Sequence, residues 1–204
     1  MSNYVWYLSY GSNINKDRFL CYIKGGKPEG SKVCEKGCKD TTLPKEDKFI
    51  KIPHKLYFAK HSSRWNGGVC FIEDSKGKDY TIGKMYLITK EQFKDVYRQE
   101  NSDNNIDINL DEVIKKGTKT LKNSWYGKII YTKKEKGYPI FTFTAPWDIK
   151  EVSFNKPSKE YLKTIIKGLK DNNMNSESLV NYLINKPGVN NYYNKINLSE
   201  LIRD

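Results

Sequence analysis

A turn with one glycine and two small polar residues, Gly11, Ser12 and Asn13, separates a strand-like run at residues 4–8 from a helix-like run at residues 14–23. Aromatic and β-branched residues indicate the strand, and apolar residues at helical spacing indicate the helix. Glycine can take backbone angles closed to other residues, and backbone N–H groups at a helix N-terminus can bind an anion or an oxyanion. Ser12 and Asn13 can cap the helix or bind a ligand. The alternative is a strand-to-helix turn without a ligand.

A carboxylate at Glu100 is the second candidate for chemistry. Thr89 and Gln92 have the spacing of a capping box and begin a helix predicted over residues 90–100. Its apolar face carries Phe93, Val96 and Tyr97. Continuing that face by three and four residues reaches Glu100. A buried carboxylate without a cationic partner would have a raised pKa, as a general base needs near neutral pH. The alternative is a solvated last turn.

The chain has 204 residues, enough for one domain with a hydrophobic core. Lys and Arg number 36 against 24 Asp and Glu, a formal net charge of +12. The lysines are scattered and no basic run is interleaved with stacking aromatics, so we expect no specific nucleic-acid binding. No apolar run approaches the ~20 residues of a membrane helix, and a strand begins too early for a signal peptide. We expect a cytoplasmic monomer or homodimer without a membrane partner.

The sequence contains four cysteines: Cys21, Cys34, Cys38 and Cys70. In a cytoplasmic chain they are predicted to be thiols, because disulfides are rare in that compartment. Cys34 and Cys38 lie four apart on a polar loop, and a zinc site would also need His54 and His61 to converge on them. That spacing matches no common zinc-ligand pattern, so no metal site is predicted.

Residue patterns predict a mixture of strands and helices without an internal repeat. Strands are predicted at residues 4–8, 50–59, 69–72, 80–88, 126–132 and 138–144. Helices are predicted at residues 14–23, 90–100, 110–116, 158–169 and 176–184, and a short turn near the C-terminus. Ser158 is the predicted N-cap of the helix at residues 158–169, and Asn197 that of the terminal turn.

Three stretches between these elements have a distinctive composition. Residues 24–48 read as a long polar loop, which in a compact domain is usually functional or mobile. Pro53 either breaks the second predicted strand or divides it in two. Gly67 and Gly68 enter a buried strand, which predicts a close backbone approach or a bulge. The polar turn at residues 74–78 predicts a hairpin between the flanking strands.

Four short motifs, in this order, resemble the gamma-glutamylcyclotransferase family. They are Tyr10-Gly11-Ser12-Asn13 after a strand, Trp65-Asn66-Gly67-Gly68-Val69, Gly83 in the strand before a helix, and Gln99-Glu100 at the end of that helix. Trp125-Tyr126 resembles a later aromatic position, and the last two predicted helices resemble the family's C-terminal pair. The resemblance spans most of the chain. The long loop and Phe143, which stands where some members have tyrosine, depart from the pattern and could reshape the pocket.

The resemblance implies an α+β fold, a small mixed β-barrel flanked by helices, as a single domain over residues 1–204. It implies Glu100 as the catalytic residue and a substrate-binding set formed by Tyr10, Gly11, Ser12, Asn13, Gly67, Gly68 and Tyr126. It also implies that no metal or organic cofactor is needed.

The implied reaction is intramolecular. The α-amine of a γ-glutamyl group attacks its own γ-carbonyl, a five-membered lactam closes, and 5-oxoproline and an amine or amino acid are released. Glutathione is one such γ-glutamyl compound. Two other classes stay open: a binding protein on the same fold that captures a γ-glutamyl-like ligand without turnover, and a nucleic-acid partner of the basic surface.

Overall fold

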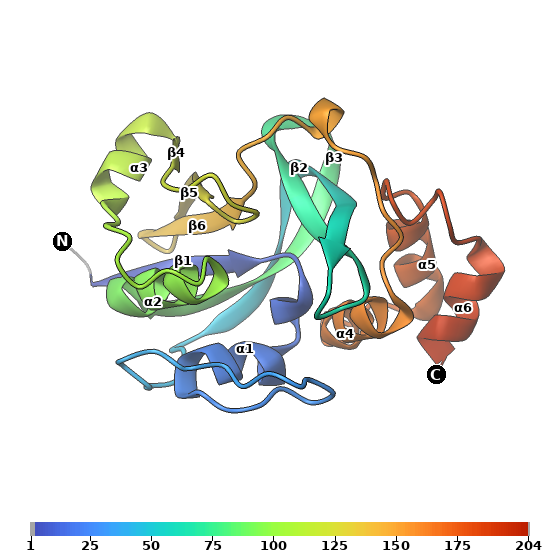
Figure 1. Cartoon of the computed structure of the whole chain (residues 1–204), viewed down its shortest axis with the longest axis horizontal. Helices are drawn as coiled ribbons and strands as arrows, with labels where there is room; N and C mark the ends of the chain where they lie inside the picture. Colours follow the sequence, from blue (N-terminus) through green and yellow to red (C-terminus); the bar gives the residue numbers. More distant parts are fainter. Residues whose placement is uncertain (1–2, 204) are drawn as a thin grey trace. The chain divides into compact units, whose positions relative to one another are not determined.

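One mixed sheet of six strands, in the order β2-β3-β1-β6-β5-β4, runs through the computed structural model, which describes residues 3–203 (Figure 1). The strands are β1 (Tyr4–Ser9), β2 (Asp47–Ser62), β3 (Gly67–Thr89), β4 (Thr118–Thr120), β5 (Lys128–Glu135) and β6 (Tyr138–Thr144). The helices are η1 (Ser12–Ile14), α1 (Lys16–Lys24), α2 (Lys90–Glu100), α3 (Leu110–Lys116), η2 (Ile149–Glu151), α4 (Lys159–Lys170), α5 (Ser176–Ile184) and α6 (Lys195–Arg203). Strand β1 pairs antiparallel with β3 and parallel with β6. The α+β class is therefore confirmed.

The predicted β-barrel is wrong. Strands β2 and β4 are the edges of the sheet, and within residues 3–203 no pairing joins them. A barrel requires a common tilt and stagger of all its strands, whereas β4 consists of only the three residues Thr118–Thr120. Such a short edge strand ends the sheet instead of continuing it to closure.

The chain divides into two compact units, and strands β2 and β3 contribute to both. Unit 1 consists of Met1–Ser9, Asp17–Ile52 and Ile82–Pro146, and unit 2 of Tyr10–Lys16, Pro53–Thr81 and Trp147–Asp204. Because both strands continue from one unit into the other, neither unit is a single stretch of sequence. One continuous domain over residues 1–204 stays our prediction.

Unit 1 has an aromatic core. The ring of Tyr7 on β1 lies 5.2 Å from that of Phe19 and 5.3 Å from that of Phe143. Phe19 from α1 also stacks on Tyr86 at 4.0 Å, and Phe93 from α2 is fully buried in the same cluster. Burying one such ring stabilises the fold by about 1.5–3 kcal/mol, so the core fixes α1 and α2 against the sheet (Figure 1). Phe143, the departure from the family pattern, is part of this core.

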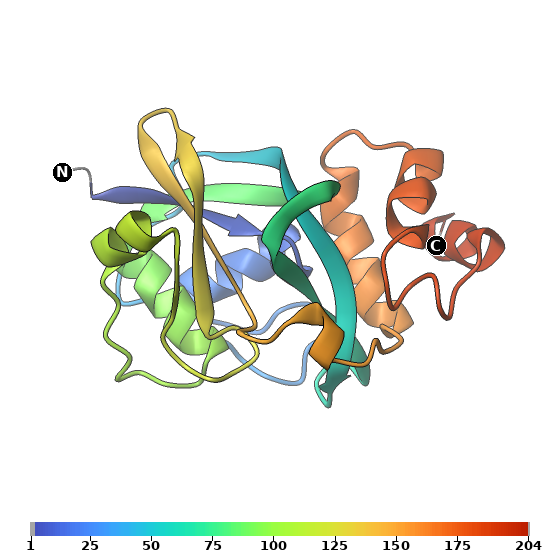
Figure 2. The same cartoon turned by 90° about the horizontal axis from the view of Figure 1, so that it is seen from above.

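Unit 2 contains the C-terminal helices α4, α5 and α6, coloured orange to red in Figure 2. Ser158 caps α4 by accepting a hydrogen bond from the Tyr161 N–H, as predicted. The prediction for the terminal turn is wrong in its boundary, because α6 begins at Lys195. Asn194 precedes it, and its side chain accepts a hydrogen bond of 2.9 Å from the Asn197 N–H. The side chain three residues earlier in the sequence is therefore the cap.

The predicted hairpin around residues 74–78 is also wrong, because β3 is one strand of 23 residues from Gly67 to Thr89. Strand β2 is its neighbour in the sheet. It is also one continuous strand, Asp47–Ser62, and is unbroken at Pro53. An edge strand can accommodate proline, since its missing N–H faces the open side. Continuous pairing has thus overridden a local sequence pattern that is typical of a turn. Residues 25–46 form the predicted long loop between α1 and β2.

Candidate functional residues

The loop at residues 10–13 belongs to unit 2 and follows β1 directly. Gly11 has φ −106° and ψ −146°, so the unusual backbone angles that we expected of this glycine are not adopted. Crowding explains the glycine instead, because a Cβ atom there would lie 2.8 Å from Cys70 Sγ and 3.3 Å from Tyr161 Oη. The first helical turn is the short helix η1, with Gly11 at its N-cap position, and α1 begins only at Lys16.

Cys70 and Tyr161 support this loop within unit 2. The Cys70 N–H donates to Tyr161 Oη at 3.3 Å, and the thiol and the hydroxyl are 3.1 Å apart. The thiol also points at the Tyr10 carbonyl, with a sulfur–oxygen distance of 3.9 Å. Burial raises the pKa of Tyr161 well above its usual value, so the phenol stays neutral. The ring of Trp65 packs against that of Tyr161 at 4.8 Å.

Sequence reasoning placed Tyr161 only in the apolar stripe of a helix and Cys70 only in a buried strand. Both placements are correct, since both side chains are buried. A hydroxyl within a helix stripe was the available signal, because a buried tyrosine hydroxyl usually has a hydrogen-bond partner. The partner of the Tyr161 hydroxyl depends on the tertiary fold and could not be predicted from the neighbouring sequence.

Gly67 and Gly68 pack against the segment that precedes α4. A Cβ at Gly67 would lie 2.8 Å from the carbonyl oxygen of Lys156, and one at Gly68 would lie 2.4 Å from that of Asn155. The close backbone approach predicted for this pair is confirmed, and the neighbour is the chain itself. Gly67 also lines a surface hollow of about 380 Å³ in unit 2. A role of the two glycines in substrate binding stays a prediction.

Glu100 belongs to unit 1 and is the last residue of α2. The capping box that begins this helix is confirmed, with Thr89 and Gln92 bonded reciprocally. Phe93, Val96 and Tyr97 are fully buried, as the periodicity predicts. Glu100 itself is half-buried. Glu91 on the first turn is exposed, whereas Glu100 has the same intermediate exposure as Arg98 and Gln99, so an inward-facing carboxylate at Glu100 stays a prediction.

The end of α2 is hydrogen-bonded to the segment that carries Tyr126, within unit 1. Asn101, the residue after Glu100, donates from Nδ2 to the Tyr126 carbonyl at 3.2 Å and to the Tyr97 carbonyl at 2.9 Å. The hydroxyl of Tyr97 donates to the Gly127 carbonyl at 2.8 Å. Two side chains at the end of α2 therefore hold the segment that carries Tyr126. The Tyr126 ring rests edge-on against a core phenylalanine.

The eight candidate residues fall into two groups. Glu100 and Tyr126 are in unit 1, and the loop at residues 10–13 with Gly67 and Gly68 is in unit 2. The contacts described above fix residues of each group to neighbouring segments of the same unit. What each group binds stays a prediction.

Three further properties of the chain bear on its class. In the part of the chain that the structure describes, no three His, Cys, Asp or Glu side chains are grouped so as to hold a metal ion. The four cysteines are free thiols. None of the helices between residues 3 and 203 has both the length and the apolar character needed to cross a membrane.

Comparisons with known proteins add the following. No family profile matches the sequence. A curated relative, Histone deacetylase 5 of Arabidopsis thaliana, is 37% identical over 206 residues, which cover 90% of this chain and 31% of that protein. The chain thus spans about a third of the length of this relative, and the name of the relative refers to the whole of that longer protein.

Two solved structures share the architecture. An uncharacterized protein from Homo sapiens aligns with a TM-score of 0.54 and 17% identity, covering 100% of both chains. A gamma-glutamyl cyclotransferase aligns with a TM-score of 0.50 and 20% identity, covering 98% of both chains. The class is therefore an α+β protein with a mixed sheet flanked by helices. Its fold is the gamma-glutamyl cyclotransferase-like fold, which confirms the resemblance of the motifs at the level of fold.

Proposed function

We propose that this chain is a gamma-glutamylcyclotransferase-like enzyme that releases 5-oxoproline from a γ-glutamyl amino acid, peptide or amine. The observation that supports this most directly is the half-buried carboxylate of Glu100 at the end of α2. The next residue, Asn101, donates a hydrogen bond to the backbone carbonyl of Tyr126. The resemblance of Gln99-Glu100 to the family's motif and the shared fold support Glu100 as the counterpart of the family's catalytic glutamate.

Glu100 is proposed as general base and then as general acid. Its carboxylate takes a proton from the substrate α-amine while the amine nitrogen bonds to the γ-carbonyl carbon. The bond from that carbon to the leaving nitrogen then breaks, and the protonated Glu100 returns the proton to this nitrogen. Atoms balance without water, and the products are 5-oxoproline and a free amine. Because both reacting groups belong to one molecule, an effective molarity of about 10^5 M or more assists the closure.

The loop at residues 10–13 is proposed to hold the substrate carboxylate or the developing oxyanion through backbone N–H groups. Cys70 and Tyr161 contact its first residues, and the loop is therefore braced by buried side chains. A braced donor group is effective because it need not reorganise when charge develops.

The test is a panel of γ-glutamyl dipeptides, γ-glutamyl amines and glutathione, with 5-oxoproline measured by mass spectrometry and binding measured by calorimetry. We expect release from at least one compound. The matched variants are Glu100→Gln and Glu91→Gln, since Glu91 lies on the same helix with an exposed side chain paired to Lys94 at 2.8 Å. Binding of a panel member without any release would refute the enzyme and favour a binding protein on the same fold.

A further inference from the structure

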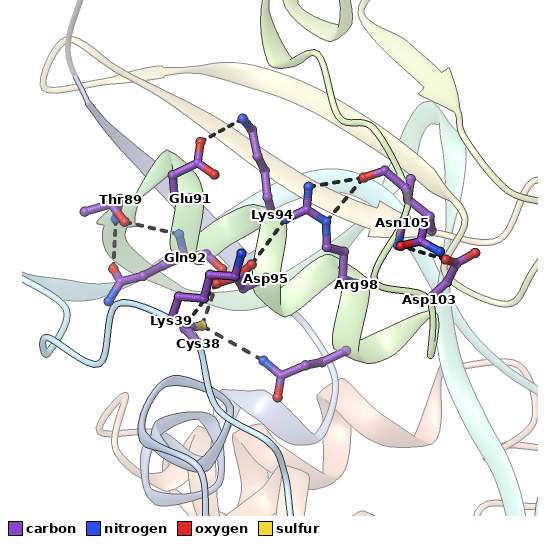
Figure 3. Close-up of polar contacts among 12 residues, drawn as sticks. Cys38, Lys39, Thr89, Glu91, Gln92, Lys94, Asp95, Arg98, Asp103 and Asn105 are labelled. Carbon is purple, nitrogen blue, oxygen red and sulfur yellow. Dashed lines mark hydrogen bonds and ion pairs between the residues drawn. The ribbon is translucent and has the colours of Figure 1, made fainter.

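One polar face of α2 binds the long loop of unit 1. Gln92 donates from Nε2 to the carbonyl groups of Asp40 at 3.0 Å and Thr42 at 2.7 Å. Asp95 accepts the Lys39 N–H at 3.0 Å. Figure 3 shows Gln92 and Asp95 on this face of the helix, with Lys39 beside Asp95. We call residues 37–42 of the loop the strap.

The strap runs antiparallel to α2. Its later residues meet Gln92 near the start of the helix, Lys39 meets Asp95, and Gly37 meets Gln99 near the end: the Gly37 N–H donates to Gln99 Oε1 at 3.1 Å. Gln92, Asp95 and Gln99 are three and four residues apart and so share one helix face. The buried apolar residues Phe93, Val96 and Tyr97 lie on the neighbouring face. The strap therefore adds a second attachment to a helix that the core already holds.

Gln99 uses both ends of its carboxamide. While Oε1 accepts from Gly37, Nε2 donates to the carbonyl of Tyr22 in the last turns of α1 at 3.0 Å. The backbone at Gly37 has φ +82°, and a Cβ there would lie 2.5 Å from the Gly25 nitrogen. Glycine is thus needed for the strap to come close enough. One side chain joins α1, the strap and α2, immediately before Glu100.

Asn101, the residue on the other side of Glu100, is also anchored. Its side chain bonds to the carbonyls of Tyr97 and Tyr126, and Lys122 Nζ donates to its backbone carbonyl at 3.2 Å. Glu100 therefore lies between two residues that are each anchored to other segments of unit 1. The backbone at the end of a helix otherwise frays easily.

We propose that Gln99 is a positioning residue for Glu100, which it acts on by fixing the last turn of α2 to α1 and the strap. This assignment rests on the proposed function of Glu100 for its catalytic consequence, whereas the fixing of the helix end is independent of it. A displacement of about 1 Å in a catalytic group can reduce the rate roughly 100-fold. Loss of the carboxamide bonds to Gly37 and Tyr22 should therefore reduce kcat much more than it changes KM.

The variant is Gln99→Met, which keeps the length of the side chain and removes the hydrogen bonds to Gly37 and Tyr22, together with the 4.0 Å contact from Nε2 to Cys38 Sγ. The matched control is Asp95→Ala, which removes a strap contact one turn earlier. We expect Gln99→Met to reduce kcat roughly 10- to 100-fold with KM within about 3-fold, from the positioning effect above. Asp95→Ala also removes the 3.2 Å ion pair with Arg98, but Arg98 keeps its two bonds to the Ile106 carbonyl and Gln99 keeps its own bonds. Its kcat should therefore stay within about 2-fold of the wild-type value.

Amide hydrogen exchange gives a readout that needs no activity. In Gln99→Met, exchange of the Asn101 and Ser102 amides, which bond to Tyr97 and Gln99 carbonyls, should be roughly 10-fold faster or more. Exchange at residues 93–97 should be unchanged, which distinguishes this from global destabilisation. Unchanged exchange at the last turn, or equal losses of kcat in both variants, would overturn the proposal. If the wild-type chain released no 5-oxoproline, the proposed function would fail, and the exchange result alone would decide whether Gln99 fixes the helix end.

Discussion

Gly11→Ala tests whether packing or backbone geometry requires the glycine of the residue 10–13 loop. The backbone angles at Gly11, φ −106° and ψ −146°, lie outside the left-handed region, so alanine adds no strain of that kind. The added methyl group, however, would lie 2.8 Å from Cys70 Sγ and 3.3 Å from Tyr161 Oη. Cys70 is buried and its thiol is already 3.1 Å from the tyrosine hydroxyl, so the sulfur has little room to move away.

Overpacking a buried site costs about 1–3 kcal/mol. For a chain of this size, 1 kcal/mol corresponds to roughly 2–4 °C in Tm. Gly11→Ala should therefore lower Tm by about 2–12 °C, measured by calorimetry and checked by urea unfolding. The packing cause makes a second, sharper prediction: Cys70→Ala removes the sulfur, and in that background Gly11→Ala should cost less than about 0.5 kcal/mol.

A double-mutant cycle over Gly11 and Cys70 thus has an expected coupling of about 1–2 kcal/mol. If Gly11→Ala were equally destabilising with and without the Cys70 sulfur, crowding would not be the reason for the glycine. A fully stable Gly11→Ala variant with lost ligand binding would instead favour our sequence-based interpretation, in which the glycine serves the ligand through its backbone.

Three further predictions concern chemistry, pH and charge. Glu100→Gln should reduce kcat by roughly 10^2–10^4-fold with folding unharmed, because a neutral amide is cheaper to bury than a carboxylate, while Glu91→Gln stays at the wild-type rate; similar rates in a 5-oxoproline assay would remove Glu100 from the mechanism. Burial lowers the pKa of Lys186 to about 8, where its ammonium donates to the Tyr80 carbonyl and lies over the Tyr80 and Tyr182 rings. Between pH 8 and about 10.5 Lys186 is therefore protonated in the unfolded chain and largely neutral in the folded one. The free energy of unfolding of the wild type, relative to that of Lys186→Met, should rise over this range. A difference between the two proteins that does not change with pH in urea unfolding would contradict this. DNA or RNA binding should be weak, indifferent to sequence and steeply reduced by salt, so tight selective binding at physiological salt in a filter or polarisation assay would reverse our view of the positive charge.

Local patterns predicted the helices well because their signals are local. The capping box at Thr89 and Gln92 and the cap at Ser158 are satisfied by residues three positions away. The apolar spacing of α2 also placed Glu100 correctly at its end. Capping and apolar periodicity depend on residues three or four positions apart within one helix, so they can be recognised without knowing the tertiary contacts.

The sheet was predicted less well because its decisive contacts are distant in sequence. The polar run at residues 74–78 has the composition of a turn, yet it is extended within β3 beside β2. Likewise, the attachment of the long loop depends on side chains of α2 that bond to backbone more than 50 residues away, such as Gln92 to Asp40. Neither the loop sequence nor the helix sequence contains a periodic signal for such bonds.

The glycines of the family-like motifs and Glu100 carry different information about this chain. Gly11, Gly67 and Gly68 each have a packing reason within unit 2, and a Cβ at Gly83 would lie 2.7 Å from the Ser9 carbonyl oxygen. A chain with this fold needs these glycines whether or not it binds a substrate, so their presence speaks for the fold. Glu100 is half-buried at the end of α2, and its place in the resemblance depends on a carboxylate and not on a close backbone approach. The chemistry of this protein is therefore tested at Glu100 and the residues that hold it, and the glycine positions test only the scaffold.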